Sequence, residues 1–136
     1  MTSFPLKIVT ADGLVYDGPA EEVIVRTITG DMAVLARHMN CVAPLGMGRA
    51  TIVANGERRY AACIGGLLSV VDGEVHLVPT TFEWSDMIDA ARADASYQRA
   101  QKILDKKDAS DTEIQLAEAR LKRALIRKSV ATRGKF

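Results

Sequence analysis

The sequence changes character at Trp84, and this change constrains the fold more than any other feature. All four prolines and nine of the ten glycines come before it, whereas no glycine or proline occurs between Trp84 and Gly134. In that second stretch β-branched residues become rarer, and Ala, Arg, Lys, Gln and Asp dominate, which is the composition of α-helices. We therefore predict two domains of different class, residues 1–84 and residues 85–136.

The first domain consists of short β-branched runs separated by turn-forming dipeptides. These dipeptides supply the positive φ angles of tight hairpins: Asp12-Gly13, Asn55-Gly56 and Asp72-Gly73. The runs expected to be strands span residues 6–10, 14–16, 23–29, 33–35, 49–54, 59–64, 67–71 and 74–79. Apolar and polar side chains alternate in residues 22–26 and 74–78, so every second side chain can enter a core. An antiparallel two-sheet β-sandwich or flattened barrel follows.

The second domain is expected to be an antiparallel hairpin of two helices. The first helix should span residues 86–105 with Ser85 as its N-cap. Its apolar stripe is Ala93, Tyr97, Ala100 and Leu104. After a polar turn at residues 106–109, Ser110 and Glu113 match the capping box that begins a second helix. The stripe of that helix is Ile114, Ala117, Leu121 and Leu125. Both stripes are narrow and rich in alanine, so the hairpin buries little apolar area and should be able to open.

Composition and motifs exclude several function classes. The 18 basic and 17 acidic residues nearly cancel, so net charge does not imply nucleic-acid or membrane binding. No GxSxG, Walker or HExxH motif is present, and we expect no catalytic residues.

Cys41 and Cys63 lack a CxxC spacing, which predicts buried thiols, no disulfide and no metal. His76 should be a surface residue. Without an export signal or an apolar run of about 18 residues, a cytoplasmic protein is expected.

Several segments resemble the ATP synthase epsilon-subunit family. Residues 8–16 (IVTADGLVY) are similar to its opening hairpin, residues 63–70 (CIGGLLSV) to its strand with a glycine pair, and residues 121–130 (LKRALIRKSV) to its C-terminal helix. The resemblance implies a ten-stranded type of sandwich followed by the helical hairpin. Residues 30–38 resemble a family loop that ends in histidine. The family usually has Gly at Ala33, often Pro-Gly at Ala36-Arg37, and Pro at Asn40, so this loop departs from the pattern.

The resemblance implies a non-catalytic subunit in the central stalk of a proton-translocating rotary ATP synthase. The sandwich would dock on the gamma subunit and the c-subunit ring, and the hairpin would inhibit ATP hydrolysis by extending beside acidic loops of the beta subunits. Membrane association would be indirect, at the cytoplasmic face of the cell membrane. The residues expected to contact partners are Asp31, His38, Arg120, Lys122 and Lys128. A purely structural role for His38 is the alternative.

Residues 88–93 (IDAARA) also fit a short motif that some bacterial epsilon subunits use to bind ATP. The matching positions are Glu83, Ile88, Asp89, Arg92, Arg99, Arg123 and Arg127. Four arginines in one hairpin repel each other unless anions intervene, and their forked donors suit phosphate oxygens. ATP would therefore be a regulatory ligand that favours the closed hairpin, and no cofactor is required. The alternative is that the arginines form i,i+3 or i,i+4 ion pairs on a solvated helix face.

Seven Lys or Arg residues and no acidic residue lie between Arg120 and Phe136, which makes this tail a local cationic arm. RNA binding is a further use of such an arm, but no aromatic residues interleave the basic ones. Two other hypotheses stay open at this stage: a free cytosolic ATP sensor without a stalk, and an interaction scaffold whose hairpin stays closed and binds no nucleotide.

Overall fold

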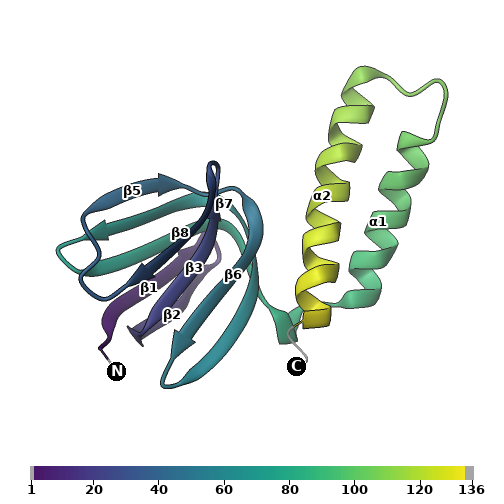
Figure 1. Ribbon diagram of the computed structural model, residues 1–136. Helices are drawn as coiled ribbons and strands as arrows, with labels where there is room; N and C mark the ends of the chain where they lie inside the picture. Colours follow the sequence, from purple (N-terminus) through teal and green to yellow (C-terminus); the bar gives the residue numbers. More distant parts are fainter. Residues whose placement is uncertain (1, 134–136) are drawn as a thin grey trace. The chain divides into compact units, whose positions relative to one another are not determined.

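The computed structural model describes residues 2–133, which divide into two compact units at the boundary between Trp84 and Ser85. The described part of the first unit holds eight strands, and that of the second holds a 3-10 turn at Ser85–Met87 followed by two α-helices (Figure 1). The strands are β1 (Phe4–Thr10), β2 (Gly13–Ala20), β3 (Glu22–Thr27), β4 (Gly30–Leu35), β5 (Cys41–Pro44), β6 (Met47–Ala54), β7 (Glu57–Val71) and β8 (Glu74–Trp84). The helices are α1 (Ala90–Leu104) and α2 (Asp111–Arg133).

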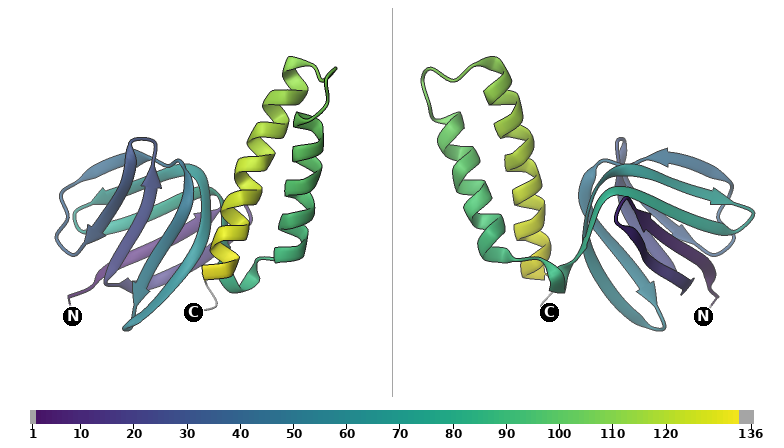
Figure 2. Two further views of the ribbon diagram at one scale, coloured as in Figure 1. Left: turned by 45° about the vertical axis from the view of Figure 1, so that its right-hand side comes forward. Right: turned by 180° about the vertical axis from the view of Figure 1, so that it is seen from behind.

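The strands form one continuous sheet in the order β2-β1-β8-β7-β6-β3-β4, with β5 attached to β7. All pairs are antiparallel except β1 with β8. Figure 2 shows the sheet curling back on itself, so that its two halves face each other as layers. Within the described residues β2 and β4 are not paired, so the sheet is not closed. The predicted sandwich is confirmed, with eight strands here instead of ten and without the closure of a barrel.

The core lies between the layers and is made of side chains that alternate along the strands. Val23 and Val25 are fully buried on β3, and Val75 and Leu77 are buried on β8 with His76 exposed between them. The predicted alternation and the surface position of His76 are therefore confirmed. Other fully buried members of the core are Leu6, Ile8, Val34, Ile52, Leu68 and Val70.

The predicted turns are present. Asn55-Gly56 and Asp72-Gly73 have positive φ at both residues, the requirement of a two-residue hairpin turn, and Gly13 has a φ of 123°. The short strand β5 was not predicted. It has only four residues and ends in Pro44, which has no N–H to donate to a ladder, so its sequence carries little strand signal.

One bent strand, β7, replaces the two strands predicted for residues 59–64 and 67–71. Its first half pairs with β6 and its last part with β5, while its register against β8 is kept throughout. The bend falls at Gly65 and Gly66, whose φ angles are 69° and 102°. A Cβ on Gly66 would overlap the carbonyl oxygen of Val78 and lie 2.5 Å from Cα of Pro79. The glycine pair therefore lets β7 bend while it stays close to β8.

In the second unit, α1 begins four residues later than predicted. Asp89 is the N-cap, with extended backbone angles and a side chain that accepts a hydrogen bond from the Arg92 N–H, so the prediction of Ser85 was wrong. Ser85 lies in a 3-10 turn and its carbonyl accepts from the Ile88 N–H. The capping box at the start of α2 is confirmed, because Ser110 Oγ accepts from the Glu113 N–H and the Glu113 carboxylate accepts from the Ser110 N–H.

The seam between α1 and α2 is made mainly of alanine. Ala93 and Ala100 of α1 and Ala117 and Ala124 of α2 are at most 4% exposed. Leu125, predicted for this stripe, is 46% exposed, because Ala124 at two turns from Ala117 takes the inward position instead.

Within residues 2–133, no helix is both long and apolar enough to cross a membrane.

Candidate functional site

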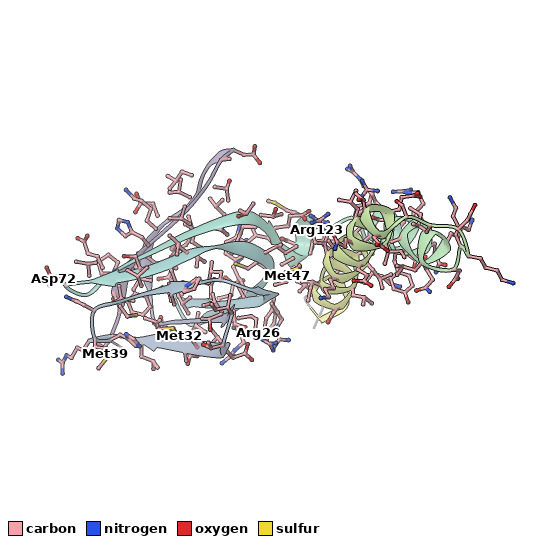
Figure 3. The ribbon with its side chains drawn as sticks, turned by 90° about the horizontal axis from the view of Figure 1, so that it is seen from above. Arg26, Met32, Met39, Met47, Asp72 and Arg123 are labelled. Atoms are coloured by element: carbon pink, nitrogen blue, oxygen red, sulfur yellow. The ribbon has the colours of Figure 1, made fainter. Side chains whose placement is uncertain are left out.

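A groove of about 300 Å³ lies between the two helices of the hairpin. Its lining is small or basic, with Ser96, Arg99, Ala100 and Ile103 contributed by α1 and Arg120, Arg123 and Arg127 by α2. Figure 3 labels Arg123 on α2. The antiparallel arrangement of the helices thus places four guanidinium groups around one hollow, each with hydrogen-bond donors in a planar fork.

The arginines of this groove have no acidic residue at ion-pairing spacing on their own helices. Arg120, Arg123 and Arg127 follow one another at i,i+3 and i,i+4 on α2, a spacing at which like charges destabilise a helix. None of the four has an Asp or Glu three or four residues away on its helix. Among residues 2–133, no carboxylate lies within ion-pair distance of Arg99, Arg120 or Arg123. The groove is therefore a concentration of positive charge suited to an anion.

Three of the seven residues predicted for a nucleotide site line this groove: Arg99, Arg123 and Arg127. Asp89 and Arg92 meet instead at the start of α1, where the carboxylate of Asp89 accepts from the Arg92 N–H at 3.0 Å. Ile88 directly precedes this cap, and Glu83 lies on β8 in the first unit. Ser96 and Arg120 also line the groove but were not predicted for this site, although each lies one turn before a predicted site arginine.

Lys128 ties α2 to α1 beside the groove. Its ammonium group lies 2.8 Å from Asp94 Oδ1 and 4.6 Å from the ring centre of Tyr97. The hydrogen bond and charge of Lys128 hold the pKa of Asp94 below its usual range. Lys128, predicted as a partner contact, thus already has two contacts inside the closed hairpin. Lys122, another predicted contact, is exposed on α2.

The predicted partner contacts of the sandwich lie on and after the β3–β4 hairpin. Asp31 of β4 is bound by Arg26 of β3, with Nε of Arg26 donating to Oδ1 at 2.6 Å, and this contact lowers the pKa of Asp31. His38 follows β4, and its Nδ1 donates to the Met39 carbonyl at 2.8 Å. Its imidazole also lies 4.0 Å from the sulfur of Cys41.

Two departures from the family pattern have visible consequences in this loop. Arg37 has a φ of 67°, a conformation that glycine adopts more easily. Asn40 replaces a proline and accepts a hydrogen bond from the Asp72 N–H at 2.8 Å, which ties the loop to the β7–β8 turn. Met39 and Asp72 accordingly lie at one end of the sandwich in Figure 3, with Arg26 and Met47 toward the other.

The two cysteines are separate. Cys63 is buried, which raises its pKa to about 12, whereas Cys41 is only half-buried, so the prediction of burial holds for the first alone. No group of three or more metal-binding side chains occurs within the described part of the chain.

Comparison with known proteins matches both units to the same family. The model described as "ATP synthase, Delta/Epsilon chain, beta-sandwich domain" matches residues 3–85, and "ATP synthase, Delta/Epsilon chain, long alpha-helix domain" matches residues 86–132. The chain belongs to the ATP synthase delta/epsilon family. It is 39% identical over 134 residues to the ATP synthase epsilon chain of Ruminococcus albus, covering 98% of this chain and 99% of that one. It is also 39% identical over 131 residues to that of Bacillus velezensis, covering 96% and 98%. The resemblance to the bacterial epsilon family is confirmed.

Chains in two solved structures of mitochondrial ATP synthases share this fold. A chain in the cryo-EM structure of the Euglena gracilis mitochondrial ATP synthase, OSCP/F1/c-ring in rotational state 1, matches with a TM-score of 0.83 at 20% identity, covering 95% of this chain and 81% of that one. A chain of the Tetrahymena thermophila mitochondrial ATP synthase central stalk/c-ring matches with a TM-score of 0.60 at 11% identity, covering 93% and 95%.

Proposed function

We propose that this chain works as the non-catalytic epsilon subunit of a rotary ATP synthase, in its central stalk. The sandwich would dock on the gamma subunit and the c-subunit ring, and the helical hairpin would act on the beta subunits. Family membership across both units and the names of the full-length relatives support this function. The Tetrahymena neighbour, described as part of a central stalk and c-ring, supports the location. Association with the cytoplasmic face of the membrane would then be indirect.

The hairpin would be the regulatory part of the subunit. A seam of alanines buries little apolar area, so packing stabilises the closed state only slightly. An extended state would then differ little from it in free energy. When extended, the basic α2 could lie against acidic loops of the catalytic beta subunits and restrain ATP hydrolysis. The contacts of Lys128 with Asp94 and Tyr97 would have to break for this extension.

ATP would regulate this opening by binding in the groove. The observation that carries this proposal is the set of arginines that both helices bring to one hollow without carboxylate partners for Arg99, Arg120 and Arg123 among the described residues. A phosphate chain would replace repulsion by charge-assisted hydrogen bonds in the closed hairpin only. At ATP concentrations about 100 times the dissociation constant, such binding would favour the closed state by about 2.7 kcal/mol. This is enough to reverse a nearly balanced equilibrium.

The first test is ATP hydrolysis by the cognate catalytic head. It is measured with the head alone, with the full chain, and with a chain ending at Asp86, each at low and high ATP. We expect the full chain to inhibit, the shortened chain to bind without inhibiting, and high ATP to relieve the inhibition. If neither chain binds the head, the stalk assignment fails. If inhibition persists unchanged at high ATP, the nucleotide-gated hairpin fails while the stalk assignment stands.

A further inference from the structure

We propose that Arg120 is a further ligand-binding residue of the groove, and that with it the site is adapted to a chain of several phosphates. This inference rests on the proposed nucleotide function and deepens it. Arg120 lies on the groove wall together with Arg99, Arg123 and Arg127, although its place in the sequence had pointed to partner contacts alone. Ser96, one turn before Arg99, adds a hydroxyl to the opposite wall.

The row of arginines on α2 has the shape that a phosphate chain needs. Arg120, Arg123 and Arg127 span seven residues of helix, which corresponds to about 10 Å along the axis. Consecutive phosphates can contact the three guanidinium groups in turn over this length, whereas a single phosphate would require all three side chains to converge on it. Arg120 extends the row at its N-terminal end by one turn.

The charges around Arg120 favour binding to an anionic ligand over an ion pair within the helix. Its neighbours at three and four residues are Leu116, Ala117, Arg123 and Ala124, so it has no intrahelical ion-pair partner and has one like-charged neighbour. No other carboxylate of the described residues pairs with it. Without an anion, Arg120 therefore adds repulsion to the hairpin. With an anion in the groove, the same charge becomes attractive.

This reversal of sign separates a ligand-binding arginine from a structural one. Arg120→Gln should leave the melting temperature of the ligand-free chain unchanged or slightly higher, because it removes a repulsive neighbour of Arg123. The same variant should lose part of the stabilisation that ATP gives. A structural arginine would lower the melting temperature in both conditions.

The test measures binding to the full-length chain by calorimetry, at one ionic strength, with ATP, AMP and inorganic tripolyphosphate as probes. Arg120→Gln should weaken ATP and tripolyphosphate binding about ten-fold, as expected for a lost charge-assisted contact, and AMP binding much less. Arg120→Lys should restore part of the loss, because it keeps the charge without the fork. Lys122→Gln is the matched control. It removes the same charge from an exposed position two residues away that is not part of the groove lining, and it should change ATP binding less than two-fold.

The outcomes separate this inference from the function on which it rests. If the unaltered chain binds ATP and Arg120→Gln binds it equally well, or no worse than Lys122→Gln does, then Arg120 is not a ligand-binding residue and the ATP proposal stands. If the chain binds tripolyphosphate in an Arg120-dependent way but gains nothing from the nucleoside, the anion site stands and nucleotide sensing fails. If it binds neither ATP nor tripolyphosphate, both proposals are wrong.

Discussion

Replacing Gly66 with alanine should strongly destabilise the sandwich, because this position combines a positive φ with close packing against β8. Its φ of 102° disfavours any residue with a Cβ, and the new methyl group would overlap the Val78 carbonyl and approach Cα of Pro79 to 2.5 Å. Both obstacles belong to the backbone of β8, so no side-chain rotation can relieve them. Strand β7 would have to flatten or move away from β8.

The cost can be worked out from these two effects. The strained φ alone costs about 1–3 kcal/mol for a non-glycine residue. Separating β7 from β8 near Gly66 and Pro79 would weaken one or two ladder hydrogen bonds, at about 1 kcal/mol each. The sum is about 2–5 kcal/mol, and we take about 3 kcal/mol as the expected loss. Gly56→Ala provides a matched control, because Gly56 also has a positive φ, of 74°, but nothing lies within 4 Å of its missing Cβ. That change should cost only about 1 kcal/mol.

Urea unfolding of the full-length chain measures both variants. The fluorescence of Trp84, the single tryptophan, reports on the sandwich because this side chain is 7% exposed within its core. With a slope of about 2 kcal/mol per M, Gly66→Ala should lower the midpoint by about 1.5 M and Gly56→Ala by about 0.5 M. Equal shifts for the two variants would show that conformational strain explains both and that close packing of β7 on β8 contributes nothing.

Three further predictions concern the loop after β4 and the hairpin. Arg37→Gly should stabilise the sandwich by about 0.5–1 kcal/mol, because it removes the Cβ penalty at a φ of 67°, and the urea midpoint measures this. Asp89→Ala should destabilise the hairpin by about 1 kcal/mol by removing the N-cap bond to the Arg92 N–H, which thermal melting followed by circular dichroism detects. The ion pair with Lys128 lowers the pKa of Asp94 in the folded state, so its stabilising effect is present above the unfolded pKa near 3.9 and is lost as pH falls through the folded pKa. Acid titration of the unaltered chain and of Asp94→Asn should show that the difference between their stabilities shrinks below pH 4.

Each of these has its own control. Arg37→Ala keeps the Cβ and should give no gain, so an equal gain from both variants would point to the lost charge instead. Asp89→Asn keeps a capping oxygen and should retain most of the hairpin stability; a loss equal to that of the alanine variant would contradict the cap. Lys128→Gln should abolish the acid dependence attributed to Asp94, and its persistence in that variant would mean that another carboxylate causes it.

Local signals in the sequence predicted much of this fold. The Asn-Gly and Asp-Gly turns, the alternation along β3 and β8, and the capping box at Ser110 each depend on a few adjacent residues, and the structure contains all of them. The start of α1 was missed because Ser85 and Asp89 are both good N-caps, and only the path of the chain through the 3-10 turn decides between them. The strand β5 was missed because its pairing with β7 is set by a distant partner.

The candidate site, too, was predicted from the sequence only in part. Arg123 and Arg127 were predicted from their resemblance to a motif, and their position on one helix face followed from spacing. That Arg99 lies across from them depends on the register between α1 and α2, which the alanine seam fixes and no local pattern reveals. Arg120 and Ser96 joined the groove for the same reason. The role of Asp89 as a cap likewise became visible only from its bond to the Arg92 N–H.

The parallel pairing of β1 with β8 also has a consequence for how the chain folds. Leu6 of β1 pairs with Val75 of β8, so roughly 70 residues must be gathered before this ladder can close, whereas the helices are joined through a turn of about six residues. Closing the longer loop costs about 2 kcal/mol more in chain entropy, and contacts so distant in sequence form slowly. Strand β1 can pair with β2 early, through the turn between Thr10 and Gly13, but its other edge stays unpaired until β8 has been synthesised. The hairpin can form as soon as its own two helices exist, so the unit that we propose to open is also the unit expected to fold faster.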